Sequence, residues 1–530
     1  MQEKFGINEM PDIYALVRFF IFMNSLLRKL SFGSSSIFSH VASKTSAPSI
    51  PPNLHLVAVA CVHRHGDRSQ IAKMETLGPI YNTKKDDNDK TDYFIDMNTG
   101  KAAKIDDNNN NNENANILSI KSLWKDKMPI AESMKCMNEA AIEDKVDDPA
   151  SSTYPVLEFT PGDSRLDETL YSGWERNNYP YGQLTEKGFQ ELFTLGQELR
   201  KRYIDTGLLG DSNSNTVDGN LFYCRSTNFC RTKQSLRSLI SGILFDPVSN
   251  SMNSKNDVKI FARPKTEETM FPQADGPCSA IAMRRAELFA DDYIAQNFKG
   301  LKYNYHDLNE IVGNILGYTD NNRDTMNWLS IREILVCHHV HNVPLPKNIT
   351  EDMIIDIDRL SGFMWNRLFS DDIFNRLAIG RFLKEFKEML EKVLTNRGGS
   401  SHKVMIYSGH DSTLVPILCA LVDRSEDTLN ISSDDSSDSL WPPYASHFEI
   451  EIARNSDDDQ LYVRALFNNE EMKIHGCKDV WCPYYKVKRR LDDIIITSEL
   501  YHMECNEAEG LGAAADQQME AEIKATTGGA

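Results

Sequence analysis

The pentapeptide Arg64-His65-Gly66-Asp67-Arg68 places a histidine between two arginines, directly after the apolar run 54–62. A guanidinium group is permanently charged and presents a planar fork of donors that matches phosphoryl oxygens. A neutral imidazole between two such groups can attack phosphorus as a nucleophile. Gly66 allows a tight backbone turn that brings the three side chains into one pocket. The motif predicts phosphoryl transfer, and a basic turn after a strand is the simpler alternative.

A second segment carries further groups of the same kind. The run 403–407 is typical of a buried strand, and Ser408-Gly409-His410-Asp411 follows it at once. A third apolar stretch, 222–224, delivers Arg225 at its end. Ligands of an open parallel sheet bind beyond the carboxyl ends of the strands. Three strand ends that are far apart in the sequence can therefore converge on one anion.

These residues resemble the signature of the histidine phosphatase superfamily in its acid phosphatase branch. That signature reads Arg-His-Gly-x-Arg-x-Pro early in the chain and His-Asp late. The resemblance runs from about residue 54 to 505, and within the branch it is closest to the lysophosphatidic acid phosphatases. Further segments that carry it are 182–188, 225–228 with Arg231, Ser235 and Gly242, then His341-Asn342, 441–445, Gly476-Cys477 and Cys482-Pro483.

The resemblance implies two catalytic residues, His65 and Asp411. His65 would attack a phosphomonoester in line and become a phosphohistidine. Asp411 would protonate the leaving oxygen and then activate water, since a group that has given a proton can take one back. The implied phosphate-binding residues are Arg64, Arg68, Arg225 and His410. The resemblance implies no metal and no other cofactor, because the arginines supply the positive charge.

The expected substrate is a small phosphomonoester, of the lysophosphatidic acid type. Two alternatives stay open. A phytase-like inositol phosphate or sugar phosphate phosphatase would line its cap with Lys and Arg, and no dense basic cluster lies near a catalytic segment. A phosphate-binding pseudoenzyme would need the arginines but neither His65 nor Asp411. Candidate residues for an acyl channel are Phe363, Met364, Trp365 and Leu368, for which core packing is the alternative.

Two residues near the motifs need separate comment. Gln70 stands where the signature has proline. Proline would fix the backbone as the chain leaves the loop, so its loss leaves open how the loop is held. The change removes no charged group, and we expect an active enzyme. Arg231 is expected to be a helix ion-pair or scaffold residue rather than a phosphate ligand.

The order of apolar runs and helical patterns predicts an α/β protein. We expect a three-layer α/β domain with a mostly parallel sheet, formed by 51–272 and 397–505, and an inserted, mostly helical cap at 273–396. The cap prediction rests on helical spacing of apolar residues from about 280 to 394. Residues 84–125 are expected to be a low-complexity insertion, and 506–530 a disordered tail.

The first 50 residues read as a leader. No acidic residue lies between Asp12 and Asp67, and basic residues lie among many serines, which is typical of an organellar transit peptide. The apolar stretch 13–27 is interrupted by Arg18 and falls short of the roughly 20 residues that span a bilayer. We expect a mitochondrial or other organellar protein without a stable membrane span, with the secretory pathway as the alternative.

Composition excludes some classes of partner. A net charge of −19 over 530 residues argues against nucleic acid. The histidines at 338, 339 and 341 lack a Cys or carboxylate at metal-ligand spacing, so we expect helix-end residues and no metal. Among ten scattered cysteines, Cys477 and Cys482 could form a disulfide in an oxidising compartment. The sequence does not predict the oligomeric state.

Overall fold

The computed structural model describes residues 48–71, 77–79, 93–96, 102–104, 117–131, 133–134, 136, 142–145, 179–210, 216–249, 251–264, 267–272, 278–395, 401–423 and 441–505. Most of the expected leader, the asparagine run at 108–112 and the expected tail at 506–530 lie outside these residues.

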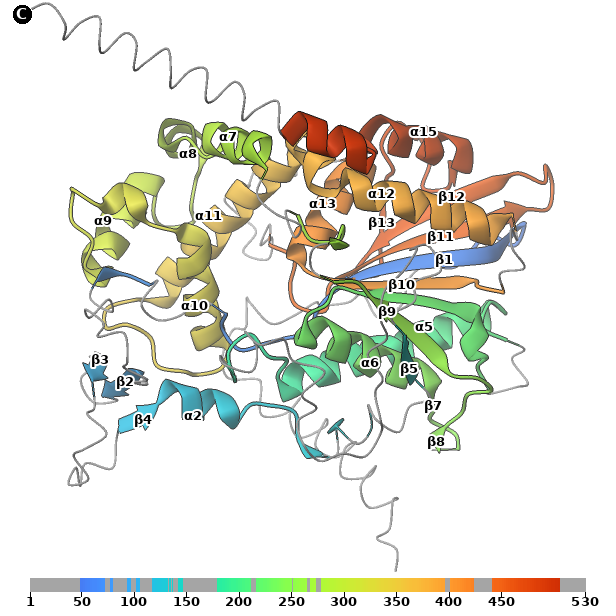
Figure 1. Ribbon diagram of the computed structural model, residues 1–530, viewed down its shortest axis with the longest axis horizontal. Helices are drawn as coiled ribbons and strands as arrows, with labels where there is room; N and C mark the ends of the chain where they lie inside the picture. Colours follow the sequence, from blue (N-terminus) through green and yellow to red (C-terminus); the bar gives the residue numbers. More distant parts are fainter. Residues whose placement is uncertain are drawn as a thin grey trace, which may run out of the picture.

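A nine-stranded sheet forms the centre, in the order β13-β12-β11-β1-β10-β6-β9-β5 with β14 paired to β12 (Figure 1). Neighbouring strands from β1 to β5 in this order are parallel, and the strands from β11 to β14 are antiparallel. The bounds are β1 (Leu54–Arg64), β5 (Ile142–Lys145), β6 (Phe222–Ser226), β9 (Val258–Ala262), β10 (Val404–Gly409), β11 (His447–Asn455), β12 (Leu461–Phe467), β13 (Glu470–Met472) and β14 (Cys482–Pro483). The prediction of an α/β fold with a mostly parallel sheet is confirmed.

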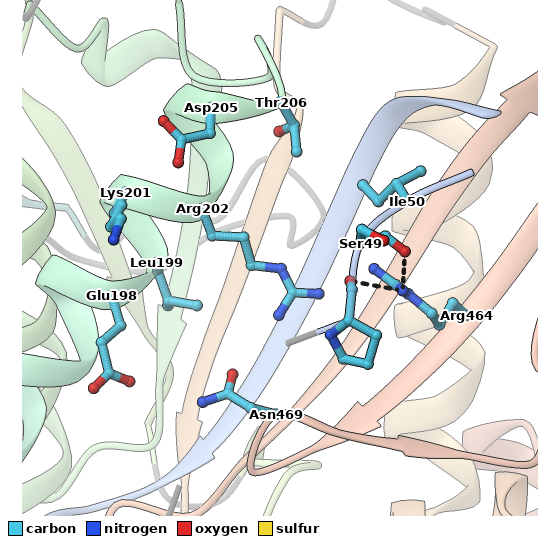
Figure 2. Close-up of a pocket in the computed structure, with 11 residues that line it drawn as sticks. Ser49, Ile50, Glu198, Leu199, Lys201, Arg202, Asp205, Thr206, Arg464 and Asn469 are labelled. Atoms are coloured by element: carbon cyan, nitrogen blue, oxygen red, sulfur yellow. Dashed lines mark hydrogen bonds between the residues drawn. The ribbon is translucent and has the colours of Figure 1, made fainter. Parts of the chain in front are cut away.

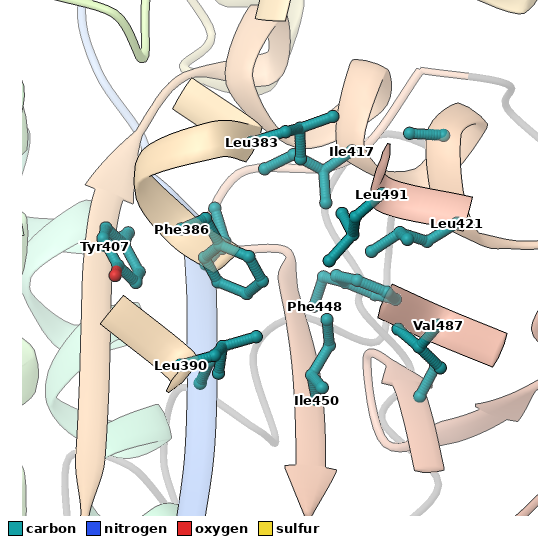
Figure 3. Packing of buried hydrophobic residues seen from close by; sticks show 14 of the residues in the cluster. Leu383, Phe386, Leu390, Tyr407, Ile417, Leu421, Phe448, Ile450, Val487 and Leu491 are labelled. Atoms are coloured by element: carbon teal, nitrogen blue, oxygen red, sulfur yellow. The ribbon is translucent and has the colours of Figure 1, made fainter. Parts of the chain in front are cut away.

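Helices cover both faces of this sheet and so make three layers. One face carries α5 (Glu186–Asp205) and α6 (Cys230–Leu244). The other carries α12 (Asp372–Leu394), α13 (Asp411–Leu421) and α15 (Tyr484–Ile494) (Figure 1). Figure 3 shows Phe386 of α12 beside Tyr407 of β10, with their ring centroids 5.5 Å apart. Because its apolar face packs on the sheet, α12 belongs to these layers, whereas the sequence placed it in the cap.

The remaining helices between 279 and 370 form a separate layer beside the sheet, as Figure 1 shows. They are α7 (Ser279–Leu288), α8 (Asp291–Asn297), α9 (Tyr305–Leu316), α10 (Trp328–Val340) and α11 (Glu351–Ser370). Apolar residues of α9, α10 and α11 make a core of their own, which also includes Trp124 of α2 (Ile120–Lys125). This helical layer is the cap that positions α10 over the motif at the end of β1.

Smaller elements complete the description. A three-stranded sheet of β2 (Tyr93–Asp96), β3 (Ala102–Lys104) and β4 (Ile117–Ser119) lies within the segment expected to be a low-complexity insertion. A hairpin of β7 (Phe245–Asp246) and β8 (Ser251–Met252) follows α6. Disulfides join Cys477 to Cys482 and Cys278 to Cys505. In the described part of the chain, no helix has both the length and the apolar character that a membrane span requires.

Candidate active site

His65 and His410 lie side by side because their strands are neighbours in register. In the parallel pair of β1 and β10, Arg64 is opposite Gly409, so the next residue of each strand emerges at the same edge. The centroids of the two imidazole rings are 5.5 Å apart. The structure thus brings the first and second motifs together, as expected for strand ends in a parallel sheet.

His65 has the protonation state of a nucleophile. Its Nδ1 atom lies 2.8 Å from the carbonyl oxygen of Gly66. A carbonyl only accepts hydrogen bonds, so Nδ1 carries the proton and Nε2 keeps its lone pair. Burial, followed by the positive charges of Arg231 and Arg64, holds the pKa of His65 well below its usual value of 6.5. The imidazole is therefore neutral, with Nε2 available for attack.

Arg64 and Arg68 enclose this histidine with unused donors. Arg64 pairs with Asp411 at 2.9 Å and lies 4.2 Å from the ring centroid of Tyr444. Arg68 pairs with Glu333 at 2.5 Å. The Nε atoms of both arginines are buried and have no hydrogen-bond partner within the residues that the structure covers. Because buried donors are nearly always satisfied, these two N–H groups are suited to phosphoryl oxygens.

Asp411 is the first residue of α13 and is the more accessible of the two residues predicted to be catalytic. Its side chain is 18% exposed, while His65 is 2% exposed. His410 precedes it, with Nε2 lying 3.0 Å from Oγ1 of Thr227. Burial and Arg231 lower the pKa of His410 well below 6.5. The carboxyl thus lies at the solvent-accessible side of the group, paired with Arg64.

The structure places Arg225 away from this group. Arg225 lies within β6, one residue before its end, and pairs with Glu268 at 2.9 Å and with Glu385 of α12 at 2.5 Å. Its guanidinium lies 5.8 Å from the ring centroid of Phe382. The side chain therefore points onto the sheet face under α12, and this placement does not support the expected phosphate contact.

Arg231, rather than Arg225, lies beside the two histidines. It is the second residue of α6, and its Nη2 atom lies 3.4 Å from Nδ1 of His410. Among charged neighbours it is the largest cause of the lowered pKa values of both His65 and His410. The sequence signal was available, because Arg231 follows the strand by five residues, at the start of a helix whose N-terminus favours anions.

A buried network supports the loop after β1. Asp67 is 0% exposed and lies 2.7 Å from Nε2 of His341, while Thr185 donates a hydrogen bond to the same carboxylate. Lys187 lies 3.9 Å from Asp67. His341 and these other contacts lower the pKa of Asp67 against the opposing effect of burial. The carboxylate is thus held as a fixed anion beneath the motif.

Gly66 is required for a reason other than a turn. Its backbone has no left-handed conformation, but a Cβ atom there would lie 2.4 Å from the carbonyl oxygen of Gly188 in α5. A Cβ on Gly188 would in turn lie 2.2 Å from the carbonyl oxygen of Asp67. These two glycines let the loop and the helix touch backbone to backbone, which the sequence could not show.

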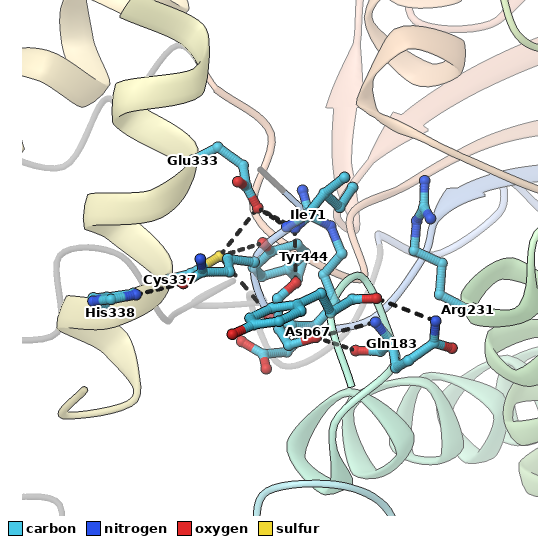
Figure 4. Close-up of polar contacts among 12 residues, drawn as sticks. Asp67, Ile71, Gln183, Arg231, Glu333, Cys337, His338 and Tyr444 are labelled. Atoms are coloured by element: carbon cyan, nitrogen blue, oxygen red, sulfur yellow. Dashed lines mark hydrogen bonds and ion pairs between the residues drawn. The ribbon is translucent and has the colours of Figure 1, made fainter. Parts of the chain in front are cut away.

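Two of the three histidines near the end of α10 contact the motif loop. His338 contacts Gln70, His341 contacts Asp67, and His339 lies 3.7 Å from Glu351. Figure 4 shows Glu333, Cys337 and His338 projecting from α10 toward the motif loop. In the described residues no group of three or more His, Cys, Asp or Glu side chains is placed to hold a metal. None of these contacts was evident from the sequence.

A pocket of about 380 Å³ lies elsewhere, between α5 and the strands β11 and β12. Figure 2 shows Arg202 pointing across it toward Ser49 and Arg464. Its two arginines already have partners, since Arg464 pairs with Glu451 at 2.7 Å and Arg202 pairs with the same carboxylate. None of the lining residues belongs to the three motifs, so we do not assign the reaction to this pocket.

Comparison with known proteins identifies the family. A family model described as the histidine phosphatase superfamily, branch 2, matches residues 55–468. The chain belongs to this superfamily. The apo form of a Hafnia alvei phytase superposes with a TM-score of 0.50 at 13% identity, covering 84% of this chain and 98% of that one. At this identity, the similarity establishes the fold alone.

Curated relatives agree with the family model. Counting factor 60 of Dictyostelium discoideum is 27% identical over 303 residues, 57% of this chain and 66% of that protein, which is just under two thirds of its length. Lysophosphatidic acid phosphatase type 6 of Bos taurus is 24% identical over 360 residues, 67% of this chain and 75% of the relative. A lysosomal acid phosphatase of Xenopus laevis is 26% identical over 332 residues, 59% of this chain and 69% of the relative. The prediction of an acid phosphatase, a phosphoric monoester hydrolase, is confirmed.

Proposed function

We propose that this superfamily member hydrolyses phosphomonoesters through a phosphohistidine formed on His65. The observation that carries the proposal is the neutral state of His65 with a free Nε2 atom, among the positive charges of Arg64 and Arg68. A phosphate-binding pseudoenzyme would require the arginines alone. The orientation of Nδ1 toward Gly66 serves no purpose in a pure binder, so hydrolysis is the better explanation.

Two balanced steps follow from this arrangement. Attack by Nε2 of His65 forms an N–P bond and breaks the bond between phosphorus and the leaving oxygen, which takes a proton from Asp411. A water molecule then gives a proton to Asp411 and attacks phosphorus, which breaks the N–P bond and releases inorganic phosphate. We infer that Arg64, Arg68, Arg231 and His410 hold the phosphoryl oxygens as negative charge moves between them.

A trapping experiment tests this mechanism. A phosphomonoester labelled on phosphorus is mixed with the enzyme and the reaction is quenched without acid, because phosphohistidine does not survive acid. We expect label on His65 of the active protein and none on a folded His65→Ala variant. Label on another residue, or full activity of His65→Ala, would contradict the proposal.

We further infer that the leaving group is apolar. The aromatic rings of Phe229 and Phe271 stand edge-on to His410, with centroids 5.0 and 5.2 Å from the imidazole centroid. Both phenylalanines are partly exposed, unlike the buried histidine between them. An acyl chain on such a wall gains about 0.8 kcal/mol for each methylene removed from water. A lipid monophosphate of the kind named in the lysophosphatidic acid phosphatase relative is consistent with this wall.

The residues nominated from the sequence are not arranged as one channel wall. Met364 packs in the core of the cap, and Leu368 packs in a different cluster together with Phe374 of α12. Phe363 contacts Phe298, while Trp365 stacks on Trp441. Core packing, the alternative for this run, accounts for Met364 and Leu368, so the apolar contact is assigned to Phe229 and Phe271 instead.

A chain-length series tests the leaving group. Catalytic efficiency on lysophosphatidates should rise with acyl length, and Phe271→Ala should flatten this rise while p-nitrophenyl phosphate is still hydrolysed. Phe245→Ala is the matched control, because Phe245 follows the far end of the 15-residue α6, about 20 Å from Phe229. A flat response in the unaltered enzyme, together with efficient turnover of inositol hexakisphosphate, would move the assignment to the phytase-like alternative.

We infer an oxidising compartment from the disulfides. Disulfides persist in secretory and lysosomal compartments and are rare where thiols are kept reduced. The pair Cys278 and Cys505 joins the cap to the last described helix, in addition to the pair Cys477 and Cys482, which the sequence left open. An organelle of the secretory pathway, which was the alternative from the sequence, accounts for both bonds better than the mitochondrial matrix does.

A further inference from the structure

The loop after β1 is fixed on one side by backbone hydrogen bonds. Ser69 N–H donates to Gln183 O at 3.0 Å, and Gly182 N–H donates to Gln70 O at 2.8 Å. Thr185 N–H donates to Asp67 O at 3.0 Å. These bonds fix the path of the chain, but they leave the other side of the loop to be held by side chains.

Side chains of α10 and of its C-cap residue supply those contacts. Glu333 and His338 lie within α10, and His341 caps its C-terminus. Each of them contacts a different part of the loop. The contacts are Glu333 Oε1 with Arg68 Nη1 at 2.5 Å and with Ile71 N at 2.7 Å, His338 Nε2 with Gln70 Oε1, and His341 Nε2 with Asp67 Oδ1 at 2.7 Å.

The contact between His338 and Gln70 is completely buried. Both residues are 0% exposed. Nδ1 of His338 lies 2.8 Å from Pro344 O, which orients the ring so that Nε2 faces the loop. A buried polar side chain costs free energy unless it is bonded, so this arrangement requires both partners.

Glutamine suits this position because of its amide. The carbonyl of Pro344 only accepts, so Nδ1 of the neutral His338 ring carries the proton and Nε2 keeps its lone pair. The NH₂ group of the Gln70 amide can then donate to Nε2. Burial lowers the pKa of His338 to about 4. Gln70 stands where the family signature has proline, which would restrain the same backbone covalently.

We propose that His338 is a positioning residue of the phosphatase, which acts through Gln70 to hold the loop that carries Arg68. The contact between His338 and Gln70 restrains the loop backbone, as the proline of the signature would. It thereby couples α10 of the cap to the phosphate-binding loop. The inference rests on the phosphate chemistry proposed above. It concerns this chain in particular, since the interaction exists only where the proline is replaced.

A double-mutant cycle tests the coupling, with p-nitrophenyl phosphate as substrate and inorganic phosphate as competitive inhibitor. His338→Ala should lower kcat/KM by about 10- to 100-fold, since displacements of about 1 Å can cost that much, and should weaken phosphate inhibition. In the background of Gln70→Pro, the same His338→Ala change should cost less than about threefold. His338→Gln, which can still bond Gln70, should keep most of the activity.

Controls separate positioning from folding. His339→Ala changes a neighbouring histidine of α10 that faces Glu351, and it should leave kcat/KM and phosphate inhibition unchanged within about twofold. Thermal unfolding of every variant reports whether the protein is folded. An equal loss from His338→Ala in both backgrounds would overturn the inference. An unaltered enzyme that does not hydrolyse the substrate at all would instead contradict the proposed function.

Discussion

Arg225 and Arg231 lie six positions apart, yet their side chains lie in different environments. Side chains along a strand alternate between its two faces, and Arg225 shares a face with Tyr223, which packs beside Tyr407. The direction of Arg225 therefore follows from its place within β6 rather than from its closeness to the strand end. Arg231 lies past the strand, where α6 begins, and is free of that alternation.

Substitution of the two arginines should give opposite results. Arg231→Ala should leave the fold intact and lower kcat/KM by about 100- to 1000-fold, as loss of one donor to a developing oxyanion does. Arg225→Ala should destabilise the protein by about 3–5 kcal/mol, because it leaves Glu268 buried without its cation. Steady-state kinetics and denaturant unfolding of both variants measure this. Normal stability of Arg225→Ala with a large loss of activity would restore Arg225 as a phosphate ligand.

Asp411 should distinguish substrates by their leaving group. Asp411→Asn removes the proton donor, so it should slow alkyl phosphates such as glycerol phosphates much more than p-nitrophenyl phosphate, whose leaving group needs little protonation. The comparison of kcat/KM for the two substrates is the measurement. Equal losses on both would show that Asp411 serves mainly through its pair with Arg64.

At the scale of elements, the contact between the motif loop and α5 depends on two glycines. Gly188→Ala would place a Cβ atom 2.2 Å from the carbonyl oxygen of Asp67. The backbone of one element must then move, and the loop with Arg68 would move with it. We expect a loss of at least about 100-fold in kcat/KM and a lower melting temperature. Gly207→Ala is the control for substitution of a glycine near α5. A Cβ atom at Gly207 would meet nothing within 4 Å, although its φ of 75° itself strains an alanine.

The sequence predicted the elements that carry the motifs better than the contacts between elements. Apolar runs before residues 64 and 409 identified β1 and β10, because buried strands need continuous apolar sequence. An apolar helix face has the same sequence pattern whether it packs on a cap or on a sheet, so the layer to which α12 belongs could not be predicted. Contacts between α10 and a loop more than 250 residues earlier determine the roles of Gln70, His338 and His341. A local sequence pattern carries no information about such long-range contacts.

At the scale of the whole molecule, buried histidines tie stability to pH. Burial lowers the pKa values of His63 and His338 to about 4, from 6.5. Between these values the unfolded chain binds protons that the folded protein does not, so stability is complete above pH 6.5 and falls toward pH 4. Each histidine contributes about 3 kcal/mol to this change. Glu449, with a pKa of about 2, adds a further loss below pH 4.5. Glu191, whose pKa is raised from 4.5 to about 7, opposes the trend between pH 7 and pH 4.5, so the two histidines together must outweigh it.

Thermal unfolding across this range measures the linkage. The melting temperature should fall steadily from pH 6.5 to pH 4, and His63→Gln should make that fall shallower by removing one of the two groups. His55→Gln serves as the control, because His55 is exposed. A melting temperature that is constant from pH 6.5 to pH 4.5 would show that neither histidine stays neutral in the folded protein.

The bond between Cys278 and Cys505 closes residues 278–505 into a covalent ring. It runs from the start of α7 through the cap, β10 and the antiparallel strands, and back to the first cysteine. A single cut within that ring, for example after the exposed Lys347, opens it without releasing a piece. A nicked molecule would therefore migrate as one chain on a gel until a reductant separates it into two. Proteolytic cleavage inside this ring therefore goes unnoticed in any preparation analysed only without reduction.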